Sequence, residues 1–349
     1  MAMPISNHVQ SRPRLSLRLC LSAGFYYSGI VPLARWWASR SQPHLTILYY
    51  HQASKANLRS HWEYVRRHYR VLPLETALAE LHASAQKGVQ GKDRRPLVAL
   101  TFDDGYYDNY THAFALAREL QLPMTIFLIP GHMESGKSFW WSNRLIRHAR
   151  AQQVTFEERS YNLSDQEECK ALAQVFDARY SSLTTREEQA KFLASLYMLL
   201  DVPSTVVLKE EPTPLLSWEQ VKEMEESGLV SFGGHTMHHP DLGSLVDHEE
   251  IEREVGECRT VLEQRLGHPI HSFAYPFGST GEYGPVAAKL AGYDWAATVK
   301  PGINTKQTNP HLLYRRNMDG DKHWLVMAAE TAGIWGFFSR LKSMTRKYL

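Results

Sequence analysis

An α/β fold is predicted by seven apolar runs, rich in β-branched and aromatic residues, that alternate with helical patterns. A chain that alternates strands with helices pairs its strands in parallel. Seven such strands indicate a distorted (β/α)7 barrel of the TIM type rather than an open sheet. The runs are residues 44–50, 96–102, 123–129, 228–234, 269–276, 295–299 and 312–316.

The first strand is preceded by a basic, amphipathic segment, residues 1–43. Its arginines come before an apolar, aromatic stretch at 19–37, which Pro32 interrupts. This stretch is too irregular for a membrane span, and no A-x-A-like cleavage site follows it. Two interpretations stay open. The segment is an amphipathic helix that packs on the protein's own domain, or it makes peripheral contact with a membrane through residues 15–37.

The barrel is expected over residues 44–320, with one insertion. A helix is predicted over 107–121, because Pro123 follows it and cannot continue it. The alternation then breaks at about 137–215, which is polar, charged and mostly helical in pattern. The aromatic start of this insertion, 139–149, could cap the site, or the insertion could be a plain structural layer.

The clearest helix lies at 247–266, after the fourth strand. Asp247 and Glu250 match a capping box, and Gly267 stops the helix. A further helix is expected at the carboxyl end, within residues 321–349.

Composition excludes some functional classes. The formal net charge is +2, so no general positive field favours nucleic acid. Cys20, Cys169 and Cys258 are far apart and form no CxxC pair, which argues against a disulfide framework or a thiolate metal site. A cytoplasmic location is therefore expected, at the inner face of the membrane if the first segment contacts lipid. Export stays open, because the basic and apolar start also resembles part of a signal peptide.

Two adjacent carboxylates, Asp103 and Asp104, follow the run at 96–102, where a strand is expected to end. Neither has a basic neighbour in TFDDGYYDNY (101–110), and unpaired carboxylates near a core are unfavourable. They lie in solvent on an ordinary turn, or they meet a cation. The carboxyl ends of barrel strands are where active sites lie.

Three histidines follow another apolar run in GLVSFGGHTMHHPDL (228–242). His235 and His239 are four residues apart, and imidazole is a common metal ligand. Alone, the pattern also fits a solvent-exposed turn. Together with the acid pair, two imidazoles and one carboxylate would form a three-ligand site with positions left for water and substrate. The remaining aspartate would then be the base of metal-assisted hydrolysis.

These motifs resemble those of the polysaccharide deacetylase family, also called the NodB-homology domain or carbohydrate esterase family 4. TFDDG at 101–105 is similar to the first motif of the family. HTMHHP at 235–240 is similar to the second, H-[ST]-x-x-H-P. FAYPFG at 273–278 resembles the third motif, and LTILYYHQ at 45–52 resembles the first strand of many members. The resemblance covers approximately residues 44–320.

The resemblance implies a distorted barrel, a divalent metal, and hydrolysis of an N-acetyl (sometimes O-acetyl) group on a sugar. By this resemblance Asp104, His235 and His239 would hold the metal, most often Zn²⁺, with Co²⁺, Mn²⁺ or Ni²⁺ as alternatives. Asp103 would be the general base. The backbone N–H of Phe277 would stabilise the oxyanion of the tetrahedral intermediate.

Other residues would support this site. Thr236 would hold the histidine loop, and Tyr275 lies in the third motif. His51, at the end of the first strand, faces the site or makes a structural hydrogen bond. His238 is expected to be a bystander.

The sequence departs from the family at two places. The third motif commonly carries an arginine that orients the base, and Ala274 stands at that position here. Arg315 or Arg316 would supply this charge from a neighbouring strand, or both form surface ion pairs. The general-acid histidine of the family has no clear match, and His311 and His323 are candidates by sequence position only.

The predicted function is therefore that of a carbohydrate deacetylase, a hydrolase of carbon–nitrogen bonds. Its substrate is expected to be a surface or cell-wall glycan or a lipid-linked precursor. The alternative is a catalytically inactive carbohydrate-binding protein of the same fold. A metal-free glycosidase is less well supported, because adjacent acids are poorly placed to flank a sugar ring. No feature of the sequence indicates an oligomeric state.

Overall fold

The chain forms two compact units. The larger is Gln42–Asp321, and the smaller combines Met1–Ser41 with Lys322–Leu349, so the two ends of the chain belong to one unit. The structure, a computed structural model, describes residues 16–40, 43–53, 57–83, 93–135, 145–146, 148–183, 185–202, 215–318 and 322–335.

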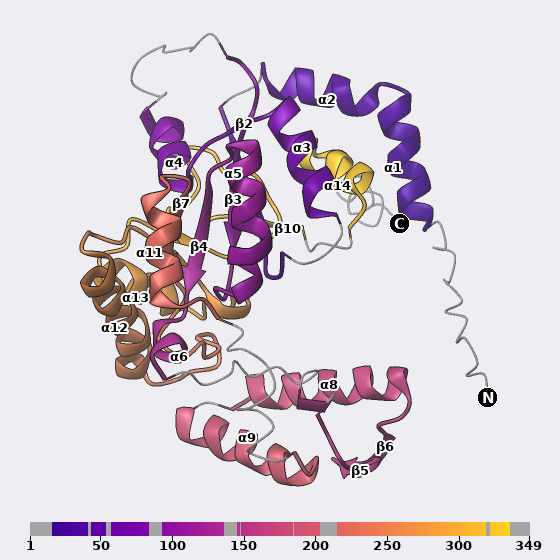
Figure 1. Cartoon of the computed structure of the whole chain (residues 1–349), viewed down its shortest axis with the longest axis vertical. Coiled ribbons are helices and arrows are strands. Elements are labelled where there is room, and N and C mark those ends of the chain that lie inside the picture. The colour runs from indigo at the N-terminus through magenta and orange to yellow at the C-terminus, as the bar shows by residue number, and fades with distance from the viewer. Residues whose placement is uncertain are drawn as a thin grey trace, which may run out of the picture. The chain divides into compact units, whose positions relative to one another are not determined.

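A curled parallel sheet forms the larger unit and confirms the predicted α/β fold of distorted-barrel type (Figure 1). Seven strands follow one another in the order β10-β1-β3-β4-β7-β8-β9, and β2 pairs with the start of β3. The strands of this sheet are β1 (Leu45–Tyr50), β2 (Arg70–Val71), β3 (Leu97–Phe102), β4 (Met124–Leu128), β7 (Val230–Gly234), β8 (Ser272–Ala274), β9 (Trp295–Ala297) and β10 (Arg316–Asn317).

Helices connect most of these strands. Asp247 caps the longest of them through the backbone N–H of Glu249, and Gly267 ends it in the left-handed conformation. The helices are α3 (Leu58–His68), α4 (Leu74–Ala83), α5 (Ala115–Leu120), α6 (Pro130–Ser135), α11 (Trp218–Glu226), α12 (His248–Leu266) and α13 (Gly284–Leu290).

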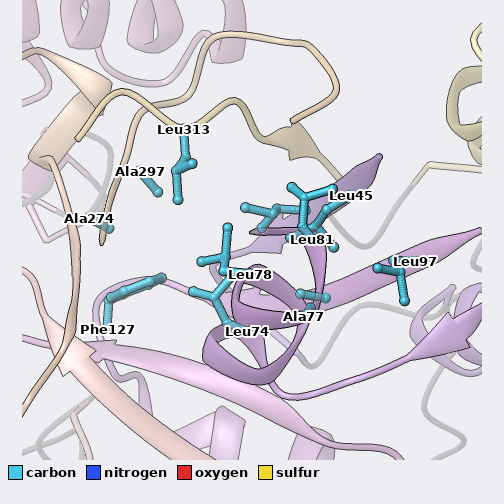
Figure 2. Packing of buried hydrophobic residues seen from close by; sticks show 12 residues of the cluster. Leu45, Leu74, Ala77, Leu78, Leu81, Leu97, Phe127, Ala274, Ala297 and Leu313 are labelled. Atoms are coloured by element: carbon cyan, nitrogen blue, oxygen red, sulfur yellow. The ribbon is translucent and has the colours of Figure 1, made fainter. Parts of the chain in front are cut away.

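The core lies inside the curled sheet and holds the strands in register (Figure 2). Strands β1, β3 and β4 are buried along their whole length, as expected for parallel strands covered on both faces. Helix α4 adds its leucines to the same cluster as the first residues of β1 and β3. The cluster comprises Leu45, Ile47, Leu74, Ala77, Leu78, Leu81, Leu97, Ala99, Phe127, Ala274, Ala297 and Leu313.

The segment before β10 differs from the predicted strand at 312–316. Leu313 pairs with β9, where its N–H donates to the carbonyl of Ala296, and only Arg316 and Asn317 pair with β1. The segment thus passes from the last strand of the sheet to the first, because the curled sheet brings β9 and β1 near one another. This crossing sets the position of Arg315.

The predicted helix at 107–121 is also modified. It begins with a π-helical turn, η1 (Asn109–Phe114), and continues as α5 to Leu120. Such π-turns are uncommon and occur frequently at functional sites. This one begins five residues after Asp104.

The insertion between β4 and β7 has a core of its own. It contains the expected helices α8 (Gln166–Ser181) and α9 (Arg186–Leu199). It also contains an antiparallel hairpin, β5 (Gln153–Phe156) and β6 (Arg159–Asn162), that the prediction missed. Each of these strands buries a single residue, so no alternating pattern marks them in the sequence. Most of the aromatic stretch at 139–149 lies outside the described residues.

The smaller unit is helical, with α1 (Leu17–Tyr27), α2 (Ile30–Ala38) and α14 (Trp324–Thr331). Helix α1 packs on α14 through an ion pair of 2.6 Å between Arg18 and Glu330. The rings of Tyr26 and Trp324 also contact each other edge to face, with their centroids 5.0 Å apart. The expected carboxyl-terminal helix is described only as far as residue 335.

The predicted N-terminal amphipathic helix is broken in two. Gly29, with φ of 84°, separates α1 from α2, and the two helices are bent by 70°. Among the described residues, no single helix has the length and apolar character to cross a membrane. Only α1 and α2 taken together meet those two criteria.

Candidate metal centre

The two chemical motifs follow strands that flank β4. Asp103 and Asp104 come directly after β3, and His235 comes directly after β7. Because the order is β3-β4-β7 and all three strands are parallel, both motifs lie at the same edge of the sheet. This is the carboxyl edge, where barrel enzymes place their catalytic residues.

The structure brings Asp104, His235 and His239 together in one buried group, with their ligand atoms within 4.8 Å of one another. Each histidine Nε2 lies 3.4 Å from Oδ1 of Asp104. Two donors about 2.1 Å from a zinc ion, at the tetrahedral angle of about 109°, are about 3.4 Å apart. The distance from Asp104 to each histidine nitrogen is therefore compatible with two ligands of one divalent metal ion.

The surroundings of Asp104 also point to a cation. Both carboxylate oxygens are buried, and neither accepts a hydrogen bond from the described part of the chain. A buried carboxylate without a partner is strongly unfavourable. A divalent metal at this position would satisfy both its charge and its lone pairs.

The Nε2 atoms of both histidines face Asp104. Nδ1 of His235 lies 2.7 Å from the carbonyl oxygen of Ala274 and donates to it as N–H, which leaves the lone pair on Nε2. Burial lowers the pKa of His239 well below its usual value, and the neighbouring His235 lowers it further. The ring of His239 can therefore act as a ligand near neutral pH.

The backbone is strained around this group. Eight non-glycine residues of the described chain have positive φ, and Asp104, Thr236, His239 and Phe277 are four of them. This conformation costs roughly 1–3 kcal/mol for each such residue. Half of the strained residues thus lie in the three motifs that surround the Asp104–His235–His239 group.

Hydrogen bonds hold the histidine loop in this conformation. The hydroxyl of Thr236 accepts from the backbone N–H of His239 at 2.8 Å. Glu254, on α12, accepts from the backbone N–H and from Nδ1 of His238, both at 2.9 Å. His238 therefore anchors the loop to α12 and does not face Asp104.

The two glycines before His235 are required for space. A Cβ on Gly233 would lie 2.7 Å from the ring of Phe127. A Cβ on Gly234 would lie 2.3 Å from the hydroxyl of Tyr293. The close packing of β7 against its neighbours thus depends on the GG pair in the motif.

Arg315 holds the second acid. Its guanidinium donates to both oxygens of Asp103, at 2.7 and 2.8 Å, and its Nε donates to the carbonyl of Thr298. Neither Arg315 nor Asp103 reaches solvent appreciably. Burial alone would raise the pKa of Asp103, but the charge and hydrogen bonds of Arg315, with His235 nearby, hold this pKa below its ordinary value.

Arg315 is thus the arginine that pairs with Asp103, from a different part of the chain than Ala274, where the sequence comparison expected one. Arg316, the other candidate, is the first residue of β10 and pairs with Leu48 of β1. Only Arg315, which precedes the strand, pairs with Asp103. The guanidinium of Arg315 also lies over the ring of Tyr49, at 4.6 Å.

The remaining predicted residues lie at the same edge. Phe277 has its ring 4.8 Å from that of His239, so residue 277 adjoins the metal group. Tyr275 is buried, and its hydroxyl donates to the carbonyl of His311, which makes it a packing residue. His51 interacts electrostatically with both Asp103 and His239, which places it near the group.

The two candidate general acids are engaged elsewhere. Nε2 of His311 lies 2.8 Å from the carbonyl of Tyr293, which precedes β9 and so lies at the amino side of the sheet. The side chain of His323 caps α14 in the smaller unit, where its Nδ1 accepts from Leu325.

Sequence reasoning missed three contributors to the site: the carbonyl of Ala274, Glu254, and His132 of α6. His132 acts electrostatically on His239, and its Nε2 lies 3.1 Å from the carbonyl of His238. A backbone carbonyl leaves no signal in the sequence. Glu254 has one, because a charged residue on the apolar side of α12 stands out from its neighbours.

A curled parallel sheet carries a buried Asp–His–His group and a second acid at its carboxyl edge, as the sequence motifs predicted. The family model for polysaccharide deacetylases matches residues 90–192 and 164–296. The chain therefore belongs to the polysaccharide deacetylase family.

Individual relatives are distant. The protein YxkH of Bacillus subtilis (strain 168) is 22% identical over 283 residues, which are 80% of this chain and 73% of that protein. The fold is shared with the Streptococcus pyogenes deacetylase PplD, solved with acetate, at a TM-score of 0.53 and 18% identity over 82% of this chain and 97% of that one. The BpsB deacetylase domain of Bordetella bronchiseptica gives a TM-score of 0.52 and 14% identity over 80% and 97%.

Proposed function

We propose that this chain is a metal-dependent deacetylase that removes the N-acetyl group of a carbohydrate. The observation that carries the proposal is that two adjacent acids have different bonding partners. Asp104 has two buried oxygens without hydrogen bonds in the described structure, and it faces two imidazoles. Asp103 is held by a guanidinium instead. One acid is thus built to bind a cation and the other to remain an ionised base.

Asp104, His235 and His239 would hold the metal, and Zn²⁺ is the ion that we propose because it commonly binds histidine and carboxylate ligands. When bound, a divalent metal supplies Lewis-acid polarisation of the acetyl carbonyl and makes water a better nucleophile near neutral pH.

Asp103 accepts the proton of the attacking water. Its low pKa keeps it ionised, and each oxygen retains a second lone pair beside the one that Arg315 occupies. Arg315 fixes the orientation of the carboxylate, which is what a general base in a rigid site requires. The backbone N–H of Phe277 donates to the oxygen on which negative charge develops.

The proton then passes to the leaving nitrogen. Since His311 and His323 are engaged elsewhere, Asp103 returns the proton that it took from water. The carbon–nitrogen bond breaks, and the second proton of the water also passes to the nitrogen, so acetate leaves and the sugar keeps an ammonium group. Water supplies the oxygen of acetate and both added hydrogens of the ammonium group, so atoms and charge balance.

The substrate that we propose is a surface or cell-wall glycan or its lipid-linked precursor, because the family acts on polysaccharides. A panel of N-acetylated sugars and oligomers, with O-acetylated analogues beside them, would identify the bond that is cleaved.

The test uses two aspartate variants from one stretch of sequence. Asp103→Asn should retain Zn²⁺ and lose at least roughly 100-fold in acetate release, as general bases contribute this much. The matched control, Asp108→Asn, should keep both properties. Undiminished acetate release by Asp103→Asn would exclude its role as the base.

An inactive carbohydrate-binding protein is the second candidate, and the positions of His311 and His323 favour it. Such a protein would bind metal and glycan and release no acetate from any member of the panel. Measurable metal-dependent acetate release excludes it.

A further inference from the structure

The smaller unit carries a large excess of positive charge. Within Met1–Ser41 and Lys322–Leu349 the sequence holds ten lysine and arginine residues and a single acid, Glu330. Glu330 is buried and paired with both Arg18 and Lys322. The whole chain has a formal net charge of only +2, so the larger unit is net negative. Such segregation of charge points to an anionic partner for the smaller unit.

The exposed side of α2 is apolar, whereas the exposed side of a helix in water is ordinarily polar. Ile30, Leu33 and Trp37 recur at helical spacing, and Leu33 and Trp37 are 63% and 69% exposed. Trp36 is exposed beside them, with the guanidinium of Arg40 4.1 Å from its ring. The opposite side of the helix buries Val31. A helix in water normally shows the reverse pattern.

Helix α1 also exposes apolar side chains. Leu17, Leu21 and Tyr27 lie on its exposed side, and Tyr27 is 75% exposed. Its opposite side buries Ser22 and packs on α14. The exposed apolar side chains of α1 and α2, with the rings at Tyr27, Trp36 and Trp37, form what we call the aromatic face.

We propose that the aromatic face of α1 and α2 docks on an anionic lipid surface. The charge is complementary, because arginines flank the face and the unit has no exposed acid in its described part. Large apolar and aromatic side chains are what the boundary between lipid headgroups and acyl chains accommodates. Nucleic acid would use the positive charge but would leave the isoleucine and leucines in water. The proposal goes beyond deacetylation and stands apart from it.

The experiment is flotation of the full-length protein with two kinds of vesicle. One contains phosphatidylethanolamine with phosphatidylglycerol, and the other is neutral phosphatidylcholine. We expect binding to the anionic vesicles at least about 100-fold tighter than to the neutral ones, since each basic residue near the surface contributes about fivefold. Raising the salt concentration should weaken this binding.

Two double variants test the aromatic face directly. Leu33→Glu with Trp37→Glu should lower binding to anionic vesicles by at least about 100-fold, because each loses a large apolar group from the lipid boundary. The control is Val286→Glu with Leu290→Glu, an exposed apolar pair of the same spacing on α13 of the larger unit, and it should bind as the wild type does.

Several results would overturn the proposal. Wild-type protein that binds neither vesicle, or a Leu33/Trp37 variant that binds normally, would do so. So would a wild-type dimer that this variant converts to a monomer without any vesicle binding, or retention on DNA in place of vesicles. Acetate release from a soluble substrate, measured on the same variants, should stay unchanged and so reports separately on the proposed catalytic function.

Discussion

Replacement of Arg315 by methionine tests how the proposed base is held. Arg315 donates two short hydrogen bonds to Asp103, and both side chains are buried. Methionine keeps much of the apolar contact but leaves a buried carboxylate without its cation. Breaking such a pair costs about 3–5 kcal/mol. Loss of the cation–π contact with Tyr49 adds roughly 0.5–2 kcal/mol. We expect the free energy of unfolding at pH 7 to fall by about 3–5 kcal/mol or more.

A double-mutant cycle isolates the part that belongs to the pair. The four proteins are the wild type, Arg315→Met, Asp103→Asn and the double variant, each stripped of metal and unfolded in urea. The double variant should lose less free energy of unfolding than the two single variants lose in sum. We expect a coupling energy of at least about 1 kcal/mol. Effects that add to within about 0.5 kcal/mol would refute the pairing.

The same pair sets a dependence on pH. The folded-state pKa of Asp103 lies below its ordinary value. Its stabilisation is therefore complete above the unfolded pKa of about 3.9 and is lost as pH falls through the folded pKa. The difference in stability between wild type and Arg315→Met should be larger near neutrality than at acid pH, where it shrinks. A difference that stays constant into the acid range would contradict this.

Three further predictions concern the surroundings of the site. Gly234→Ala places a Cβ 2.3 Å from the hydroxyl of Tyr293, so thermal unfolding should show a loss of about 1–3 kcal/mol, and an unchanged Tm would be evidence against this packing. Glu254→Ala removes both hydrogen bonds that anchor His238, so Zn²⁺ affinity in a chelator competition should drop about 10-fold or more, whereas equal affinity would show that the anchor is dispensable. Burial raises the pKa of Cys258 to about 12, so mass spectrometry after iodoacetamide treatment of the folded protein should find this thiol unmodified and the exposed cysteine of α1 alkylated.

The fold could be predicted because its strands are buried on both faces. Runs such as 96–102 and 123–129 are apolar throughout, which sets them apart from the helices between them. The missed elements are those whose stability comes from elsewhere. The β5–β6 hairpin buries one residue in each strand, and the two residues of β10 depend on β1 for their pairing.

The metal group could be predicted because each motif is local. Asp104 lies in one short stretch and the two histidines in another, and parallel strands of a barrel bring such stretches to one edge. The choice between Arg315 and Arg316 could not be made, since it depends on where the chain crosses from β9 to β1. A shift by one residue would turn the other arginine inward. The role of the Ala274 carbonyl could not be predicted either, because every residue has a backbone carbonyl.

The most direct test of the central claim is the metal content of the purified protein, measured with acetate release on the same sample. The account predicts about one Zn²⁺ per chain, acetate release that a chelator abolishes and added Zn²⁺ restores, and loss of the metal in His239→Ala. A chain that takes up no divalent metal after reconstitution, or that releases acetate equally well without one, would contradict the assignment of Asp104, His235 and His239.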